Sequence, residues 1–173
     1  QDDRPFFLYV AFNAVHGPLN PPPSFAGDPD DPLAIRDAML SRLDQAVGQI
    51  SRAIDDHGFR DNTLFIFTND NGPVLESMSK PFRGTKNTTF EGGVRQPAIL
   101  RWPGHTQPGS IKEGMMFIAD FFPTLITLAG GKHAQERPID GIDMTSMLFD
   151  DAPSPRQEII LSLIHISEPT RRT

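Results

Sequence analysis

Asp70 and Asn71 stand side by side after an apolar run at residues 63–68, and both carry oxygen atoms that could bind a cation. Hard cations such as Ca²⁺ and Mg²⁺ prefer clustered carboxylate and amide oxygens of this kind. An ion that takes roughly six to eight ligands would need further oxygens from elsewhere in the protein. Gly72 and Pro73 follow, and Asn-Asp-Asn-Gly is also ordinary turn chemistry, so the pair by itself favours a simple turn.

His16 and Lys86 are two further side chains whose positions suggest chemistry. His16 lies four residues after an apolar run at residues 6–12, where it could act as a general acid or contact an oxyanion. Lys86 lies in a glycine-rich stretch, residues 83–95, whose backbone could approach an anion while the ammonium supplies a charge for phosphate or sulfate. The spacing of a Walker motif is absent. A loop histidine bonded to backbone and a solvated surface loop would explain these residues individually.

The predicted elements would bring the candidates to one edge of a sheet. Residues 6–12 and 63–68 are predicted buried strands, and residues 33–57 between them form a predicted amphipathic helix that Gly58 ends. A strand–helix–strand unit predicts a parallel sheet, whose ligands bind at the carboxyl ends of the strands. A pair of metal-binding side chains, a histidine and a lysine at that edge are the groups that an enzyme needs to hydrolyse an anionic ester.

Later residues continue the α/β pattern. Residues 97–102 are a predicted third strand, and residues 117–128 contain a predicted helix with Asp120 as its N-cap. The fold class predicted from these elements is therefore α/β with a mostly parallel sheet.

Composition excludes several classes of protein. The 173 residues carry a formal net charge of −6, which gives no electrostatic footprint for nucleic acid. Cysteine is absent, so these residues hold no disulfide, thiolate zinc site or cysteine nucleophile. No apolar run approaches the roughly 18 residues that a membrane span needs.

A series of motifs in a fixed order resembles the arylsulfatase-like, formylglycine-dependent sulfatases. The resemblance extends from Pro5 to about Ile160 and is specific because several motifs recur in the family's order. The motifs lie at residues 6–18, 43–48, 63–73, 83–86, 90–97, 102–104 and 120–125.

The resemblance implies a fold and a role for each candidate residue. The fold would be the alkaline-phosphatase-like α/β sandwich with a mostly parallel central sheet, incomplete here. Asp70 and Asn71 would be two ligands of a Ca²⁺ ion, with Mg²⁺ as the less favoured metal. His16 would contact the sulfate ester near the leaving oxygen, and Lys86 would bind the sulfate group.

In this family the nucleophile is a hydrated formylglycine made from a Cys or Ser in a Cys/Ser-x-Pro-x-Arg motif. The sequence lacks this motif, since Ser154-Pro155-Arg156 is similar only superficially, so the motif is expected upstream. We therefore expect residues 1–160 to be a partial catalytic domain that is inactive alone. Residues 161–173 resemble a translated sequencing adapter and are expected to be a non-native tail.

The family also implies a substrate and a location. The substrate would be a small-molecule or glycan sulfate ester, and the protein would be exported, lysosomal or periplasmic. Two other functions stay open: a phosphate or phosphonate ester hydrolase of the same superfamily, or a degenerate, non-catalytic binding module. The sequence does not indicate an oligomeric state.

Overall fold

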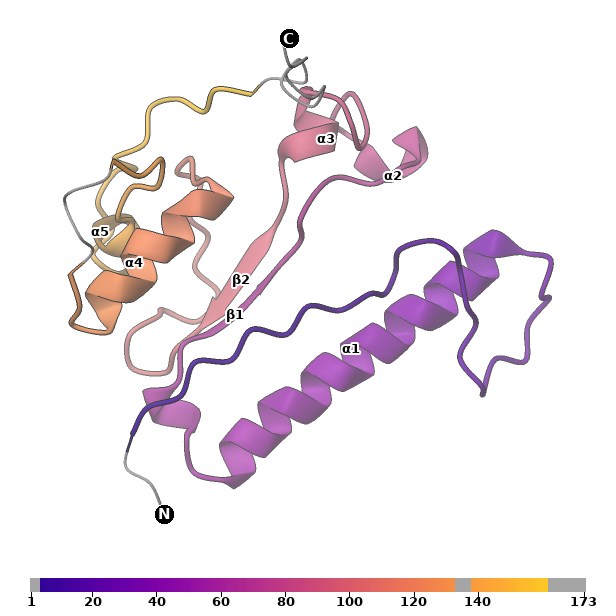
Figure 1. Ribbon diagram of the computed structural model, residues 1–173, viewed down its shortest axis with the longest axis horizontal. Helices are drawn as coiled ribbons and strands as arrows, with labels where there is room; N and C mark the ends of the chain where they lie inside the picture. Colours follow the sequence, from indigo (N-terminus) through magenta and orange to yellow (C-terminus); the bar gives the residue numbers. More distant parts are fainter. Residues whose placement is uncertain (1–3, 133–137, 162–173) are drawn as a thin grey trace, which may run out of the picture. The chain divides into compact units, whose positions relative to one another are not determined.

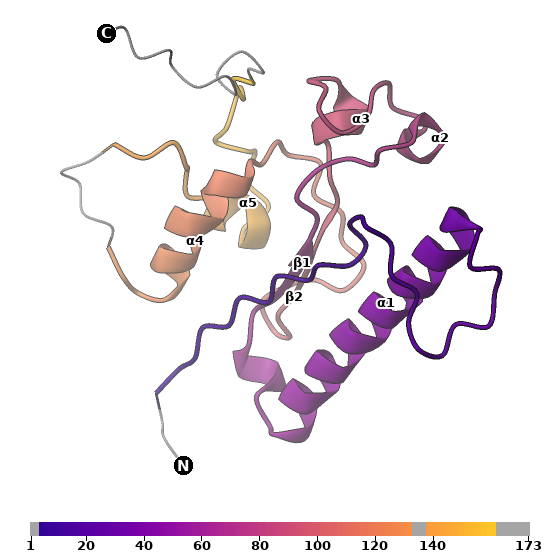
Figure 2. The same cartoon turned by 45° about the vertical axis from the view of Figure 1, so that its right-hand side comes forward.

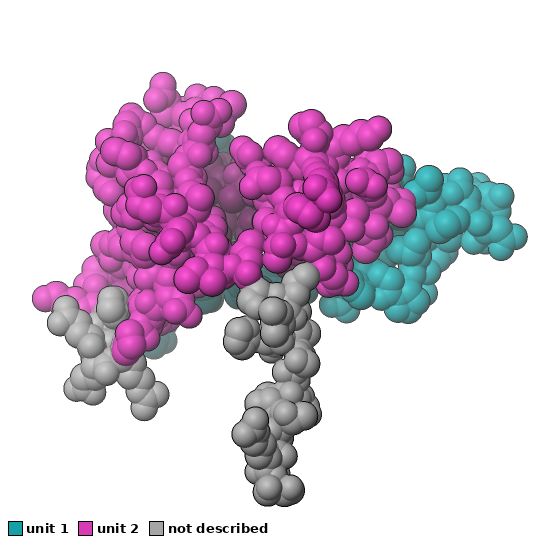
Figure 3. Space-filling model, turned by 90° about the horizontal axis from the view of Figure 1, so that it is seen from above, with its two compact units in different colours: residues 1–60 teal, residues 61–173 magenta. Residues whose placement is uncertain are grey.

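A computed structural model describes residues 4–132 and 138–161 and divides the chain into two compact units. Unit 1 comprises Gln1–Arg60 and unit 2 comprises Asp61–Thr173 (Figure 3). The predicted non-native tail at residues 161–173 lies, apart from Leu161, outside the described residues.

Helix α1 (Pro32–Asp56) dominates unit 1 and confirms the predicted amphipathic helix (Figure 1). Asp31 is its N-cap, and the carboxylate of Asp31 accepts hydrogen bonds from the backbone N–H groups of Leu33 (2.9 Å) and Ala34 (3.2 Å). These bonds satisfy two of the donors that a helix start leaves without partners. After the helix, Gly58 adopts a φ of +77°, the left-handed conformation that the predicted end of the helix requires.

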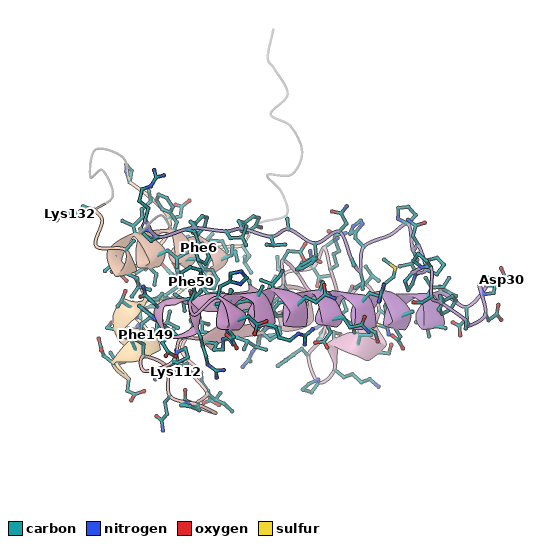
Figure 4. The ribbon with its side chains drawn as sticks, turned by 90° about the horizontal axis from the view of Figure 1, so that it is seen from below. Phe6, Asp30, Phe59, Lys112, Lys132 and Phe149 are labelled. Carbon is teal, nitrogen blue, oxygen red and sulfur yellow. The ribbon has the colours of Figure 1, made fainter. Side chains whose placement is uncertain are left out.

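Residues 6–12 are extended but do not form the predicted buried strand. Their backbone joins no strand ladder among the described residues, and most of the side chains face solvent, with Phe7 80% and Tyr9 81% exposed. An apolar run becomes a buried strand only when neighbouring strands bind its backbone and cover both faces. The ring of Phe6 does meet Phe59 edge-on at 5.9 Å, within unit 1 (Figure 4).

Unit 2 contains a two-stranded sheet of β1 (Phe65–Thr68) and β2 (Ala98–Arg101), close to two of the predicted strands. The strands are antiparallel, with Phe65 opposite Arg101 and Thr68 opposite Ala98 (Figures 1 and 2). The predicted mostly parallel sheet is therefore not confirmed. Parallel pairing is predicted for residues 6–12 and 63–68, but residues 6–12 join no ladder among the described residues. The pair that does form, β1 and β2, has no long crossover helix between its strands, so the chain enters β2 at the end where it leaves β1.

Short helices make up the rest of the regular structure. Helices α2 (Glu76–Ser79) and α3 (Glu91–Val94) interrupt the connection between the strands. The remaining elements are η1 (Arg60–Asn62), η2 (Ile118–Asp120), α4 (Phe121–Leu128) and α5 (Thr145–Phe149). Within the described ranges, no helix combines the length and apolarity that crossing a membrane would need.

Asp120 occupies the predicted N-cap position of α4, but its side chain does not cap that helix. The carboxylate is fully buried and instead accepts hydrogen bonds from the backbone N–H groups of Phe117 and Ile142, both at 2.7 Å. Arg156 completes the arrangement through Nε at 2.8 Å and Nη2 at 2.5 Å. Burial raises the pKa of Asp120, but the hydrogen bonds from Arg156, Ile142 and Phe117 outweigh it, so the pKa lies below its ordinary value.

Candidate functional site

Residues 69–73, called here the acidic turn, follow directly after β1. Asp70 is exposed and Asn71 is half-buried, and the side-chain amide of Asn71 donates a hydrogen bond to Oδ2 of Asp70. The prediction of a polar turn at the end of a strand is thus confirmed in its position. Because the carboxylate lies at the surface, it stays hydrated and accessible to a ligand.

The donor atoms of the acidic turn fit two positions of a Ca²⁺ coordination shell. A carboxylate and an amide oxygen are the ligand types that this hard cation takes. In residues 4–132 and 138–161, no group of three or more His, Asp or Glu side chains gathers to hold a metal ion. Asp70 and Asn71 could therefore supply only part of a coordination shell.

The acidic turn is bonded to residues 83–95, called here the lysine loop. The backbone N–H of Gly72 donates to the carbonyl of Gly93 at 2.9 Å, and that of Lys86 donates to the carbonyl of Pro73 at 2.8 Å. Two bonds between segments that are distant in sequence fix one against the other. The structure thereby brings Lys86 beside the turn that carries Asp70, as the sequence predicted for these two candidates.

Three glycines make this close approach possible. A Cβ atom on Gly72 would lie 2.0 Å from the carbonyl oxygen of Gly92. On Gly92 it would lie 2.2 Å from the oxygen of Gly84, and on Gly93 it would lie 2.4 Å from the oxygen of Thr85. All three distances are below any real Cβ contact, so each position requires the absence of a side chain.

Thr85 and Thr88 brace the turn that presents Lys86. The hydroxyl of Thr88 donates to the carbonyl of Thr85 at 2.7 Å and accepts from its N–H at 3.2 Å. Gly84 precedes them with a φ of +88°, which a residue with a side chain rarely adopts. Sequence reasoning missed the two threonines, although threonine hydroxyls in loops commonly form turns by bonding to nearby backbone groups.

His16 is exposed and lies in unit 1, in the loop after residues 6–12. Its backbone N–H donates to the carbonyl of Asn13 at 2.9 Å, and its Nδ1 lies 2.7 Å from the carbonyl oxygen of Gly17. Because a carbonyl oxygen can only accept, this contact is a hydrogen bond in the tautomer that carries the proton on Nδ1. The other three candidates lie in unit 2, so convergence of His16 with them remains a prediction.

Comparisons with known proteins identify relatives over most of the chain. A family model described as Sulfatase matches residues 1–131. Human arylsulfatase A is 41% identical to this chain in a match of 164 aligned positions that covers 92% of the chain and 32% of arylsulfatase A. The chain thus spans about a third of the length of this curated relative.

Solved structures give the same relationship. The crystal structure of Ps i-CgsB in complex with k-i-k-neocarrahexaose is 32% identical, with a TM-score of 0.72 over 83% of this chain and 33% of that chain. The structure of BT4656 in complex with its substrate D-glucosamine-2-N,6-O-disulfate is 25% identical, with a TM-score of 0.58 over 70% of this chain and 24% of that chain. The two neighbours are thus complexes with k-i-k-neocarrahexaose and with a disulfated glucosamine.

Proposed function

Because the chain belongs to the sulfatase family, we propose that residues 1–160 form the later part of a catalytic domain that hydrolyses a sulfate ester. The observation that carries the proposal furthest is the bonding of the lysine loop to the acidic turn. It supports the proposal because the backbone of Lys86 is bonded to the turn that carries two candidate metal ligands. A cation and a bound metal ion can together stabilise the negative charge that develops on an anionic ester as it reacts.

In this proposal, Asp70 and Asn71 hold two coordination positions of a Ca²⁺ ion, with Mg²⁺ as the less favoured metal. The bound ion would act as a Lewis acid and offset negative charge on the ester. The exposed Asp70 carboxylate offers the charged oxygen and Asn71 the neutral one. The hydrogen bond between the two side chains orients them before any ligand arrives.

Lys86 binds the sulfate group in this proposal, and His16 assists the leaving oxygen. The ammonium of Lys86 is a point charge that accepts any orientation of the sulfate oxygens. His16 would donate a proton from Nε2 to the alcohol oxygen as it leaves, while the Gly17 carbonyl holds Nδ1 and fixes the ring. The nucleophile would be a formylglycine made from an upstream Cys or Ser.

The substrate class follows from the same residues and from the neighbours. A sulfate ester on a small molecule or a glycan is proposed, since BT4656 has a sulfated sugar as its substrate. An exported, lysosomal or periplasmic location belongs to this proposal as well.

The test compares sulfate and phosphate esters in the full-length protein that carries these residues. We expect turnover of an aryl sulfate, and a loss of about 100-fold or more in kcat for Lys86→Gln and Asp70→Asn, the range seen when one charge-stabilising group is removed. Lys132→Gln, which removes a charge from an exposed position after α4, is the control and should match the parent protein.

Two results would contradict the proposal. Faster turnover of the phosphate ester would assign the site to the phosphate or phosphonate hydrolases instead. Turnover of the aryl sulfate by the purified 173-residue chain would show that no upstream nucleophile is needed.

A further inference from the structure

A hollow of about 420 Å³ opens where α2 leads into the lysine loop. Its volume is in the range of small-ligand pockets. The six residues that line it all come from one short stretch of sequence: Glu76, Ser77, Lys80, Pro81, Phe82 and Arg83. None of the four candidate site residues is among them, so the hollow is distinct from the acidic turn and from Lys86.

The backbone around the hollow is held in place by a buried serine. The hydroxyl of Ser79 donates to the carbonyl of Glu76 at 2.9 Å, and the N–H of Phe82 donates to the carbonyl of Ser79 at 2.9 Å. Ser79 itself is 5% exposed. The lining side chains therefore project from a fixed turn rather than from an unsupported loop.

The charges around the hollow favour an anion. In the part of the chain that the structure describes, neither Lys80 nor Arg83 takes part in an ion pair. The guanidinium of Arg83 stacks on the ring of Phe90 at 4.0 Å, which orients it without neutralising it. Glu76 contributes the opposing carboxylate of the lining. Two cations against one carboxylate leave a net positive charge.

The hollow adjoins the proposed sulfate position through the backbone of Arg83. The carbonyl of Arg83 accepts a hydrogen bond from the N–H of Gly92 at 2.8 Å, which ties the hollow into the same glycine contacts that position Lys86. Arg83 and Lys86 are three residues apart in sequence, so their Cα atoms are separated by at most about 11 Å. One extended ligand could therefore reach both cations.

We propose that the hollow is an accessory subsite for a second acidic group, sulfate or carboxylate, on a polyanionic sulfated glycan. The cleaved sulfate would lie at Lys86 and the second group would lie between Lys80 and Arg83. Pro81 and Phe82 supply the apolar part of the lining against which a sugar can pack, and the guanidinium of Arg95 lies 4.8 Å from the Phe82 ring. This inference rests on the proposed function, because it takes Lys86 as the position of the first sulfate.

The test measures equilibrium binding rather than turnover, so it does not depend on catalysis. Calorimetry would compare a disulfated disaccharide with its monosulfated counterpart on the full-length protein. The disulfated ligand should bind more tightly, and the double substitution Lys80→Gln/Arg83→Gln should remove about three- to tenfold of its affinity, as expected for exposed charge pairs. The effect should shrink as salt is added.

Matched variants separate the subsite from general electrostatics. Lys132→Gln removes the same charge elsewhere in unit 2 and should leave the preference intact. Lys80→Arg keeps the charge and should restore most of the affinity that Lys80→Gln loses. Circular dichroism confirms that each variant is folded, and Lys80→Gln alone leaves the Arg83–Phe90 contact undisturbed.

Three outcomes would overturn the subsite: equal loss of affinity for both ligands, no loss for either, or no preference for the disulfated ligand in the parent protein. Failure of the proposed function has a different signature. In that case the protein would bind the disulfated ligand preferentially through Lys80 and Arg83 and yet turn over no sulfate ester. That result would support the subsite and contradict the proposed reaction.

Discussion

Asp70 and Asp120 are two aspartates in the same unit with opposite surroundings. Asp70 is exposed on the acidic turn and accepts a hydrogen bond from the side chain of the neighbouring Asn71. Asp120 is fully buried, and both of its oxygens are occupied by backbone N–H groups and by Arg156. One carboxylate is accessible to a ligand, and the other has no capacity left for one.

The difference separates a carboxylate that is proposed to bind a cation from one that holds the structure together. A buried charge is tolerable only when partners replace the water it has lost, and Asp120 joins η2, the residues after 138 and the segment around Arg156 into one cluster. An exposed carboxylate costs little to keep, so Asp70 can be held available for a cation. Substitutions at the two sites should therefore produce opposite profiles of stability and function.

Replacing Asp120 should produce the largest loss of stability. Asp120→Asn removes the charge that faces Arg156, whose side chain is 10% exposed, and leaves a buried cation without its counterion. The expected cost is about 3–5 kcal/mol in the free energy of unfolding, measured by urea denaturation. The matched control is Asp37→Asn, an exposed aspartate that pairs with Arg36, which should cost well under about 1 kcal/mol. Equal losses in the free energy of unfolding for Asp120→Asn and Asp37→Asn would contradict a structural role for the buried ion pair.

The glycine contacts should come next. Gly92→Ala would place a Cβ 2.2 Å from the carbonyl oxygen of Gly84, so the lysine loop must move, at an expected cost of about 1–3 kcal/mol. Gly48→Ala is the control: Gly48 lies inside α1 with only the flexible Arg52 nearby, and alanine there should stabilise the helix by up to about 1 kcal/mol. Thermal unfolding of both variants checks the sign, and stabilisation by Gly92→Ala would contradict the structure.

Acid should weaken the Asp120 cluster. The pKa of Asp120 is lower in the folded protein than its ordinary value of 3.8, so its contribution is present above that value and is lost as the pH falls through the folded pKa. The free energy of unfolding should therefore decline in this acid range more steeply for the parent protein than for Asp120→Asn, by at most about 1.4 kcal/mol per pH unit. Denaturation at a series of pH values tests this, and identical slopes would contradict it.

Replacing Asp70 should have the smallest effect on stability. Asp70→Asn changes an exposed side chain, and we expect a change within about 0.5 kcal/mol in the free energy of unfolding. Ca²⁺ affinity should fall in the same variant, measured by calorimetry on the full-length protein, because the charged ligand is lost. A large loss of stability without added metal would place Asp70 with Asp120 as a structural residue.

Local patterns predicted the elements well and their pairing poorly. The three- and four-residue apolar spacing and the flanking Asp31 and Gly58 sufficed for α1, because a helix satisfies its own backbone. The apolar run at residues 6–12 indicated a strand, but a strand depends on partners that its own residues do not encode. The direction of β2 against β1 likewise depends on the connection between them, which shows no regular period.

Among the functional and structural side chains, too, those marked by local sequence could be predicted and those that depend on long-range partners could not. Asp70, Asn71 and Lys86 could be chosen because their residue types and flanking glycines suggest chemistry. The role of Asp120 was missed, since its partner Arg156 is 36 residues away and a helix N-cap explained it equally well from local sequence. Long-range ion pairs leave no local pattern, whereas a turn rich in glycine does.

The bonds that join the acidic turn to the lysine loop also have a consequence for how this protein can diversify. The hydrogen bonds from Gly72 to Gly93 and from Lys86 to Pro73 hold together the two ends of the loop that contains α2 and the adjacent hollow. Because the two ends are held together, lengthening this loop has a small entropic cost, about 0.6 kcal/mol in the free energy of folding for each doubling of a flexible loop. We therefore expect the exposed positions between Val74 and Phe82 to tolerate changes of length and charge, provided that buried Ser79 is kept against Gly92.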